Sequence, residues 1–379
     1  CLSVTLVGSQ TIALEGTLKP AALRPLQNRN LGIFYLFTLI QSIGRGIWMG
    51  NILSLFIVLL AEEGAGFGSF TPNELLGITS AVTGIAMLAI ILPGGLAADK
   101  WSREGVLRIA AAVGTAGLAV IITSEDLIQI MIGLFLWGIF QGLSRPAAES
   151  ILANSLPSGR RSGPYAKVHL FMQFGMAIGP FLNVALFLFL GDRWELAILK
   201  QVMVVGVIFS LASAVLLLFL REKHSMGDES AELKAKTDSE DPKDSHRSFR
   251  MIPVLLITSS FIIGMGAGMT VKFFPVFFRD VYTLQPVAVQ IILGVGFLAT
   301  GLTGLLAQRL SLKRGRPQLI IAVQSAALGC LLLLATYPVL WVMIVVFIIR
   351  GALMNAAQPL SRSIMMDYVP KARRGFWNS

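Results

Sequence analysis

The stretch Gly138-Ile-Phe-Gln-Gly-Leu-Ser-Arg-Pro-Ala-Ala-Glu149 has a diverged second copy, which lies 213 residues later in one register without a gap. The matched positions are Ser102 and Gly315, Arg103 and Arg316, Gly138 and Gly351, Pro146 and Pro359, Pro157 and Pro370, and Arg160-Arg161 and Arg373-Arg374. One register that holds over this length indicates two copies of one structural unit. An internal repeat of this kind determines the architecture.

The composition excludes a soluble domain. Hydrophobic residues make up 55% of the chain, charged residues only 14%, and the mean hydropathy is +0.73. Long uncharged runs cover residues 75–98, 170–191, 201–220, 251–271 and 281–308. A helix needs ~20 apolar residues to cross a bilayer, and the alternating pattern of a membrane barrel is missing. The sequence therefore predicts an all-α polytopic membrane protein.

Ten membrane spans are expected. They lie near residues 31–60, 74–98, 105–123, 126–154, 163–190, 195–220, 251–278, 284–308, 317–335 and 339–366. Lys and Arg gather in the loops that follow the even-numbered spans, namely Lys100, Arg103, Arg108, Arg160, Arg161, Lys167, Arg309, Lys313, Arg314, Arg316, Lys371, Arg373 and Arg374. The opposite loops hold only Arg193 and Arg279. Because basic loops stay in the cytoplasm, both ends of the chain are predicted to be cytoplasmic.

The chain divides into four predicted parts. Residues 1–30 form a cytoplasmic segment, and residues 31–220 form a bundle of six helices. Residues 221–250 carry seven Lys or Arg and eight Asp or Glu, which is too little apolar surface to fold alone. Residues 251–379 form a partial second bundle of four helices. Since the chain starts at Cys1 and stops just after a loop, we expect a fragment.

Several functional classes lack support. The net charge of +10 comes from basic residues scattered among short loops, so it does not indicate nucleic-acid binding. The two cysteines, Cys1 and Cys330, offer neither a disulfide framework nor metal-ligand spacing. Metalloprotease, nucleotide-loop and serine-hydrolase motifs are missing from the sequence. We therefore expect no cofactor, no metal and no enzyme.

With its ten spans, charged linker and internal repeat, the sequence resembles the major facilitator superfamily. That family carries a loop G-x-x-x-D-[RK]-x-G-[RK] between spans 2 and 3. Here the loop is Gly95-Leu-Ala-Ala-Asp-Lys-Trp-Ser-Arg103, with Ser102 in place of the usual glycine, and Leu312 replaces the aspartate in the second copy. The resemblance implies two bundles around a central cavity that opens alternately to the two sides of the membrane. The family has two further spans.

The resemblance also implies a cytoplasmic gate. In this interpretation the gate residues are Gly95, Asp99, Lys100, Arg103, Arg145 and Glu149. Asp99 would accept hydrogen bonds from an arginine or a helix N-terminus and hold the bundles shut on the inside. Arg145 and Glu149 share one face of the fourth span with Gln141. The alternative is an ordinary set of loop charges, with Arg145 and Glu149 paired at the membrane surface.

Cations lie deep in the predicted spans. Arg45 is ~21 Å along the first span, with Gln41 and Trp48 on its face, and Arg350 is ~18 Å into the tenth. Lys272 is 21 residues into the seventh, where the alternative is that it reaches the outer surface. A deep arginine is costly unless it meets water or a partner. The resemblance implies that spans 1, 4, 7 and 10 line the cavity.

The predicted substrate-binding residues are therefore Arg45, Gln41, Trp48, Gln141, Lys272 and Arg350. Their charge favours an organic anion, such as a carboxylate or phosphate ester. Two alternatives stay open: backbone carbonyls accept the hydrogen bonds of these cations, or Glu149 or an acidic group on the two further spans neutralises Arg350. In the second case the substrate is neutral or cationic.

The expected function is secondary transport of a small solute by alternating access, with a proton or another ion as a candidate coupling partner. The rival from another class is a membrane receptor or scaffold that kept the fold and lost transport. Deep cations favour transport, because a scaffold does not need them. Uptake into proteoliposomes discriminates between the two.

Overall fold

The computed structural model describes residues 29–156, 162–224 and 248–368. Ten helical segments of this described part are long and apolar enough to cross a membrane. They are Arg29–Gly64, Pro72–Ala98, Arg103–Thr123, Leu127–Asn154, Lys167–Leu190, Leu196–Leu217, Thr258–Asp280, Pro286–Ser311, Arg316–Leu334 and Leu340–Gln358. The prediction of ten spans in an all-α membrane protein is confirmed.

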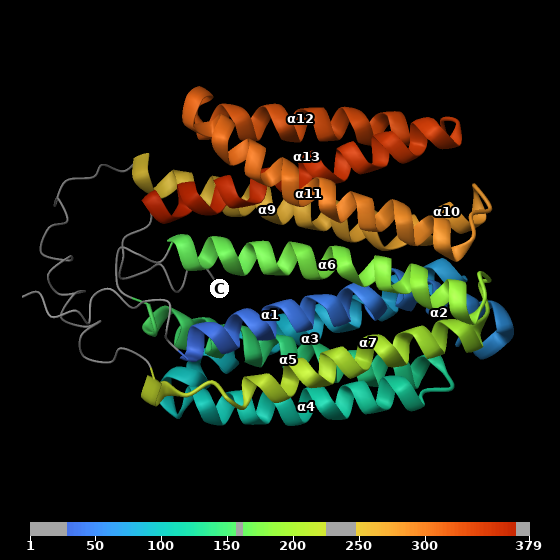
Figure 1. Ribbon diagram of the computed structural model, residues 1–379, viewed down its shortest axis with the longest axis horizontal. Helices are drawn as coiled ribbons and strands as arrows, with labels where there is room; N and C mark the ends of the chain where they lie inside the picture. Colours follow the sequence, from blue (N-terminus) through green and yellow to red (C-terminus); the bar gives the residue numbers. More distant parts are fainter. Residues whose placement is uncertain (1–28, 157–161, 225–247, 369–379) are drawn as a thin grey trace, which may run out of the picture.

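The first six spans form one group of helices, here called the N-half (Figure 1). Its elements are α1 (Arg29–Trp48), α2 (Asn51–Leu60), η3 (Ala61–Ala65), α3 (Pro72–Lys100), α4 (Arg103–Thr123), α5 (Leu127–Asn154), α6 (Ser162–Leu190) and α7 (Leu196–Leu217), followed by the short turn η4 (Glu222–His224). Helices α3 and α4 pack on α5, and α1 packs between α6 and α7.

The last four spans form the C-half. Its elements are α9 (Ser248–Thr270), η5 (Val271–Phe273), α10 (Phe274–Asp280), α11 (Pro286–Arg314), α12 (Arg316–Leu334) and α13 (Leu340–Tyr368). Helices α11 and α12 pack on α13 just as α3 and α4 pack on α5. The structure thus repeats the packing that the repeat in the sequence indicates.

Helices α6 and α11 join the two halves (Figure 1). We call the end where α3 meets α4 and α11 meets α12 the linker end, because η4 leads out of the N-half there. The end where α4 meets α5 and α10 meets α11 is the far end. Figure 1 shows α6 and α11 together at the far end and apart at the linker end.

Two of the spans are broken helices, which the sequence interpretation drew as continuous. The first breaks between Trp48 and Asn51, where Gly50 precedes α2. The seventh breaks at η5, just before Pro275 in the first turn of α10. Proline has no N–H for the preceding turn, so Pro275 weakens a continuous helix. Gly50 keeps right-handed helical backbone angles (φ −86°, ψ −64°), so the interruption there is slight. Equivalent spans of the two halves are therefore interrupted.

The loop between α3 and α4 explains the departure from the family motif at position 102. The Ser102 hydroxyl accepts a hydrogen bond from the Gly105 N–H at 3.0 Å and so caps α4. Its counterpart Gly315 has a φ of +87° and turns the chain between α11 and α12. Serine and glycine thus start equivalent helices by different means.

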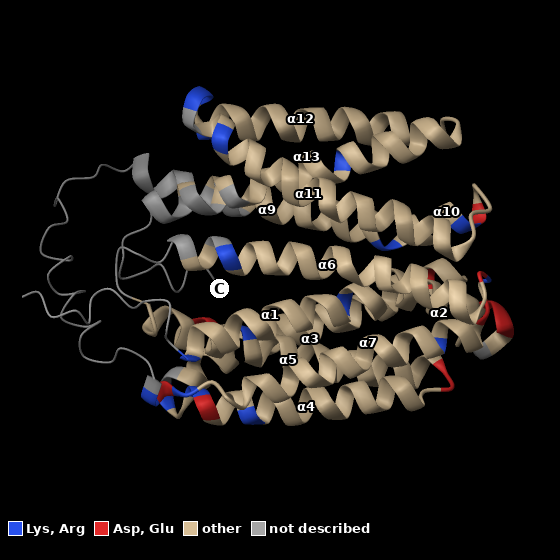
Figure 2. Ribbon diagram, in the orientation of Figure 1, with Lys and Arg blue, Asp and Glu red and all other residues tan. Residues whose placement is uncertain are grey.

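Charged residues gather at the two ends of the helices, and few lie along their middles (Figure 2). This distribution is typical of a membrane protein. Some predictions lie outside the described residues: the N-terminal segment up to residue 28, the linker over residues 225–247, Arg160-Arg161, and Lys371, Arg373 and Arg374. The domain boundaries at residues 220 and 251 therefore stay a prediction.

Candidate functional site

Two glycines bring α1 into close contact with its neighbours on either side of Arg45. A Cβ atom on Gly44 would lie 2.6 Å from the Ser210 Oγ of α7, and one on Gly46 would lie 3.0 Å from the Met176 carbonyl of α6. Successive residues of a helix are ~100° apart. Arg45 therefore projects from a third face of α1, between the directions of α7 and α6.

Arg45 is half-buried, and its Nε atom is buried without a hydrogen-bond partner in the described part of the chain. No ion pair joins it to a described carboxylate. Its charge interacts instead with two other cations, Arg145 of α5 and Lys272 of η5. A buried guanidinium nitrogen without an acceptor is costly and indicates a site that water or a ligand fills.

The other two predicted residues of α1, Gln41 and Trp48, differ in how deeply they are buried. Gln41 is half-buried, one turn toward the linker end from Arg45. Trp48 is completely buried, donates from Nε1 to the Ser210 Oγ at 2.9 Å, and packs its ring against Trp137 of α5. Trp48 therefore belongs to the core of the N-half in this conformation, and a contact with substrate stays a prediction.

Helix α5 carries the next three predicted residues on one face. Gln141 is buried, whereas Arg145 and Glu149 are exposed. Although they are one turn apart, no ion pair joins Arg145 to Glu149 in the described chain. The alternative of a surface pair between them therefore has no support in this conformation.

The C-half contributes two cations. Lys272 is half-buried in η5, at the break of the seventh span, and forms no ion pair with a described residue. Arg350 of α13 is buried, with its guanidinium 5.3 Å from the ring centre of Phe274. A guanidinium over a ring gains cation–π stabilisation. Arg350 thus has a partner within the C-half, and its role toward substrate stays a prediction.

The predicted gate residues lie at the linker end. A Cβ atom on Gly95 would lie 3.9 Å from Pro146, so this glycine is at the contact of α3 with α5. Lys100 is exposed, and Arg103 pairs with Glu222 of η4 at 3.6 Å. The side chain of Asp99 lies outside the part that the structure describes. The gate therefore stays a prediction, with Glu222 as an unforeseen partner of Arg103.

The sequence interpretation missed a set of contacts between the halves toward the far end. Two bonds link Arg279 of α10 to Glu62 of η3, with N–O distances of 2.7 and 3.2 Å. The Val287 N–H at the start of α11 donates to the Asp192 Oδ1 at 2.9 Å. An aspartate of the N-half thus caps a helix of the C-half.

Two further hydrogen bonds cross the same interface. Trp194 Nε1 donates to the Leu284 carbonyl at 2.8 Å, and Asn183 Nδ2 donates to the Gln290 Oε1 at 3.1 Å. Asn183 and Gln290 are completely buried. Arg193 and Arg279 were noted only as loop charges, and isolated Asp, Trp and Asn residues gave no sequence signal of their partners.

We call four contacts between the halves the far-end latch. They are Arg279 with Glu62, Val287 with Asp192, Trp194 with Leu284, and Asn183 with Gln290.

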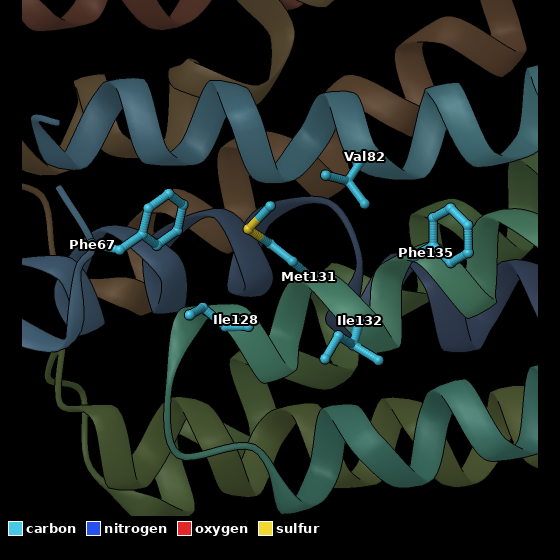
Figure 3. A pocket seen from close by; sticks show the side chains of 6 residues that line it. All are labelled: Phe67, Val82, Ile128, Met131, Ile132 and Phe135. Atoms are coloured by element: carbon cyan, nitrogen blue, oxygen red, sulfur yellow. The ribbon is translucent and has the colours of Figure 1, made fainter.

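A separate apolar pocket lies between α3 and α5 (Figure 3). Its volume is about 450 Å³, and it is lined by Phe67, Val82, Ile128, Met131, Ile132 and Phe135. None of these side chains carries a hydrogen-bonding group. The pocket suits hydrocarbon, such as a lipid chain, and cannot orient a charged solute.

Comparisons with known proteins agree with this architecture. A mutant of the nucleoside transporter NupG has a TM-score of 0.65 at 13% identity, over 92% of this chain and 87% of NupG. A D-xylose–proton symporter has a TM-score of 0.69 at 17% identity, over 92% and 84%. The human organic anion transporter TETRAN has a TM-score of 0.60 at 16% identity, over 93% and 88%.

At these identities the likeness shows the fold alone. A comparison with curated protein sequences finds no match. The model of the Major Facilitator Superfamily matches residues 34–379, which is most of the chain. The repeat, the ten spans and this match lead to one conclusion: the chain belongs to the major facilitator superfamily, a family of membrane transporters.

Proposed function

We propose that this protein is a secondary transporter that carries a small organic anion by alternating access. The observation that carries the proposal is Arg45, whose buried Nε lacks an acceptor in the described chain and which forms no ion pair with a described carboxylate. Uncompensated positive charge at this depth is tolerable in a wet cavity and useful when an anion binds there.

The one-sided closure of the molecule supports alternating access. The far-end latch joins the halves at one end, and α6 and α11 diverge at the other (Figure 1). Such a conformation is one of the two states that alternating access requires. Opening the far end breaks the latch, so contacts at the linker end have to compensate. The predicted gate around Asp99 would supply them.

The linker end is the cytoplasmic end in this proposal. It carries most of the Lys and Arg of the loops, whereas the loops of the far end hold only Arg193 and Arg279. Positive loops are retained in the cytoplasm during insertion. A conformation that diverges at the linker end would then be an inward-facing state. In this state the substrate would pass between the site and the cytoplasm.

The proposed substrate class is inferred from the positive charge of the candidate site and not from the structurally similar transporters. The solved neighbours are transporters of nucleosides, xylose and organic anions, so the fold serves different solutes. Arg45 offers a planar fork that matches a carboxylate or phosphate. Lys272 on the far-end side and Arg350 on α13 add positive potential from the C-half.

Uptake by proteoliposomes tests the proposal. The purified chain is reconstituted, a defined mixture of anionic, neutral and cationic metabolites is supplied, and the vesicle contents are measured by mass spectrometry. We expect anions to accumulate. Arg45→Lys should weaken apparent affinity by about tenfold, or about 1.4 kcal/mol, because charge remains but the fork is lost, and Arg45→Gln should weaken it further.

Two results would contradict the proposal. If only neutral or cationic solutes accumulate, the substrate is not an anion. If no solute accumulates although correctly folded protein spans the vesicles, the receptor or scaffold interpretation is favoured. Arg108→Gln is the matched control, since Arg108 is an exposed cation at the linker end whose carboxylate partner is Glu104, at 3.8 Å.

A further inference from the structure

We propose that Arg145 belongs to the substrate site, and that Lys272, Arg45 and Arg145 form a column along the cavity for a substrate with two separate anionic groups. The sequence interpretation placed Arg145 in a gate with Glu149. This inference rests on the proposed function, because it assigns a substrate class to the same site.

The register of α1 against α5 places the two arginines. The rings of Trp48 and Trp137 are in contact, with centroids 5.7 Å apart, and the two helices run in opposite directions. Arg45 lies three residues from Trp48 and Arg145 lies eight from Trp137, both toward the linker end. At 1.5 Å per residue these steps are ~4.5 Å and ~12 Å. Arg145 is therefore ~7.5 Å closer to the linker end than Arg45.

Lys272 lies on the other side of Arg45. It belongs to η5, which contacts α2, the part of the first span beyond the break on the far-end side. The three cations thus lie at three levels along the bundle axis: Lys272 toward the far end, Arg45 in the middle and Arg145 toward the linker end. Arg45 interacts electrostatically with both of the others, as expected for neighbours in one column.

No described carboxylate compensates this column. Arg45, Arg145 and Lys272 form no ion pair with a residue in the described ranges, although Glu149 is one turn from Arg145. Repulsion among like charges destabilises the free site, and a single monoanion relieves only part of it. A substrate with two separated anionic groups can contact Arg45 through one group and Arg145 through the other. Binding then gains a second charged hydrogen bond.

Arg145 is exposed, in contrast to the buried Nε of Arg45. In a conformation that diverges at the linker end, an anion arriving from that side meets Arg145 first and Arg45 second. A positive potential at the entrance also raises the local concentration of anions. Arg145 therefore sets the preference for substrate charge, whereas Arg45 holds the anionic group common to all ligands.

Butyrate and succinate test this division of roles, because they share a carbon skeleton and differ by one carboxylate. Their binding to the full chain in detergent is measured by thermal stabilisation at low ionic strength. We expect succinate to bind at least about tenfold more tightly than butyrate. Arg145→Gln should reduce this ratio toward one while butyrate binding stays unchanged, and Arg145→Lys should keep most of the ratio. Arg45→Gln should weaken both ligands.

The outcomes separate this inference from the proposed function. If Arg145→Gln leaves the ratio unchanged, or if wild-type protein binds both ligands equally, the column is wrong and anion transport stands. If neither anion stabilises the wild-type protein, the column is wrong, and the uptake experiment decides separately whether another anion is carried. Arg108→Gln controls for the general loss of a cation at the linker end and should change neither affinity. Size-exclusion profiles identify a variant that fails to fold, and Arg145→Lys then provides the second test.

Discussion

Replacing Glu62 by glutamine removes the negative partner of Arg279 and should open the far end of the molecule. The Arg279 side chain is 21% exposed and that of Glu62 is 39% exposed, so solvent screening limits this pair to about 0.5–1 kcal/mol. Asp192 adds about 0.5–2 kcal/mol as the cap of α11. Glu62→Gln combined with Asp192→Asn should cost the closed state about 1–3 kcal/mol, which changes the ratio of the two states about 5- to 150-fold.

Distances between spin labels measure this shift. With the native cysteines replaced, labels at Ser69→Cys and Val339→Cys report on the far end of each half, where both residues are exposed. The double variant should show a longer distance population in lipid nanodiscs. Glu195→Gln is the matched control, because its partner Arg193 lies at 3.3 Å in the same loop. A double variant with the same distances as this control would refute the latch.

Three further predictions concern topology, the gate and helix packing. An impermeant thiol reagent outside the cell should label Ser69→Cys and spare Lys313→Cys; the reverse pattern would overturn the orientation. Asp99→Asn should lower the transport rate without reducing delivery to the membrane, and unaltered kinetics would leave Asp99 as a loop charge. Gly46→Val should destabilise the N-half by about 1–3 kcal/mol through overpacking, since a Cβ atom there already lies 3.0 Å from the Met176 carbonyl; an unchanged Tm would contradict this close packing.

The sequence predicted the spans well because each span is determined by the hydropathy of its own consecutive residues. A run of ~20 apolar residues has few ways to satisfy its backbone in a bilayer other than a helix. The breaks at Gly50 and Pro275 were visible as residue types, but a count of apolar residues does not distinguish a kinked span from a straight one. The repeat was equally informative, since the two diverged copies share one register and pack alike: α3 and α4 pack on α5 as α11 and α12 pack on α13.

The site was only partly predictable. Depth along a helix identified Arg45 as an unusual cation, and its buried, unpartnered Nε in the described chain agrees with that reasoning. The partners across the two halves were not predictable, because Glu62 and Arg279 are separated by 217 residues, and pairing at that separation depends on tertiary packing. Arg145 was assigned to the cytoplasmic gate because it lies near the cytoplasmic end of its helix. Its level relative to Arg45 follows only from the contact of Trp48 with Trp137.

The proposed transport depends on a wet, positively charged cavity around Arg45 that opens at the linker end. This proposal is tested most directly by the reaction rates of oppositely charged thiol reagents at Gln41→Cys, with Cys1 and Cys330 replaced by serine. Gln41 lies one turn from Arg45 toward the linker end. A positive potential attracts anions and repels cations, so the anionic methanethiosulfonate should react about tenfold faster than the cationic one, and Arg45→Gln should reduce this preference. Equal rates, faster reaction of the cationic reagent, or no reaction from the linker end would contradict the proposal.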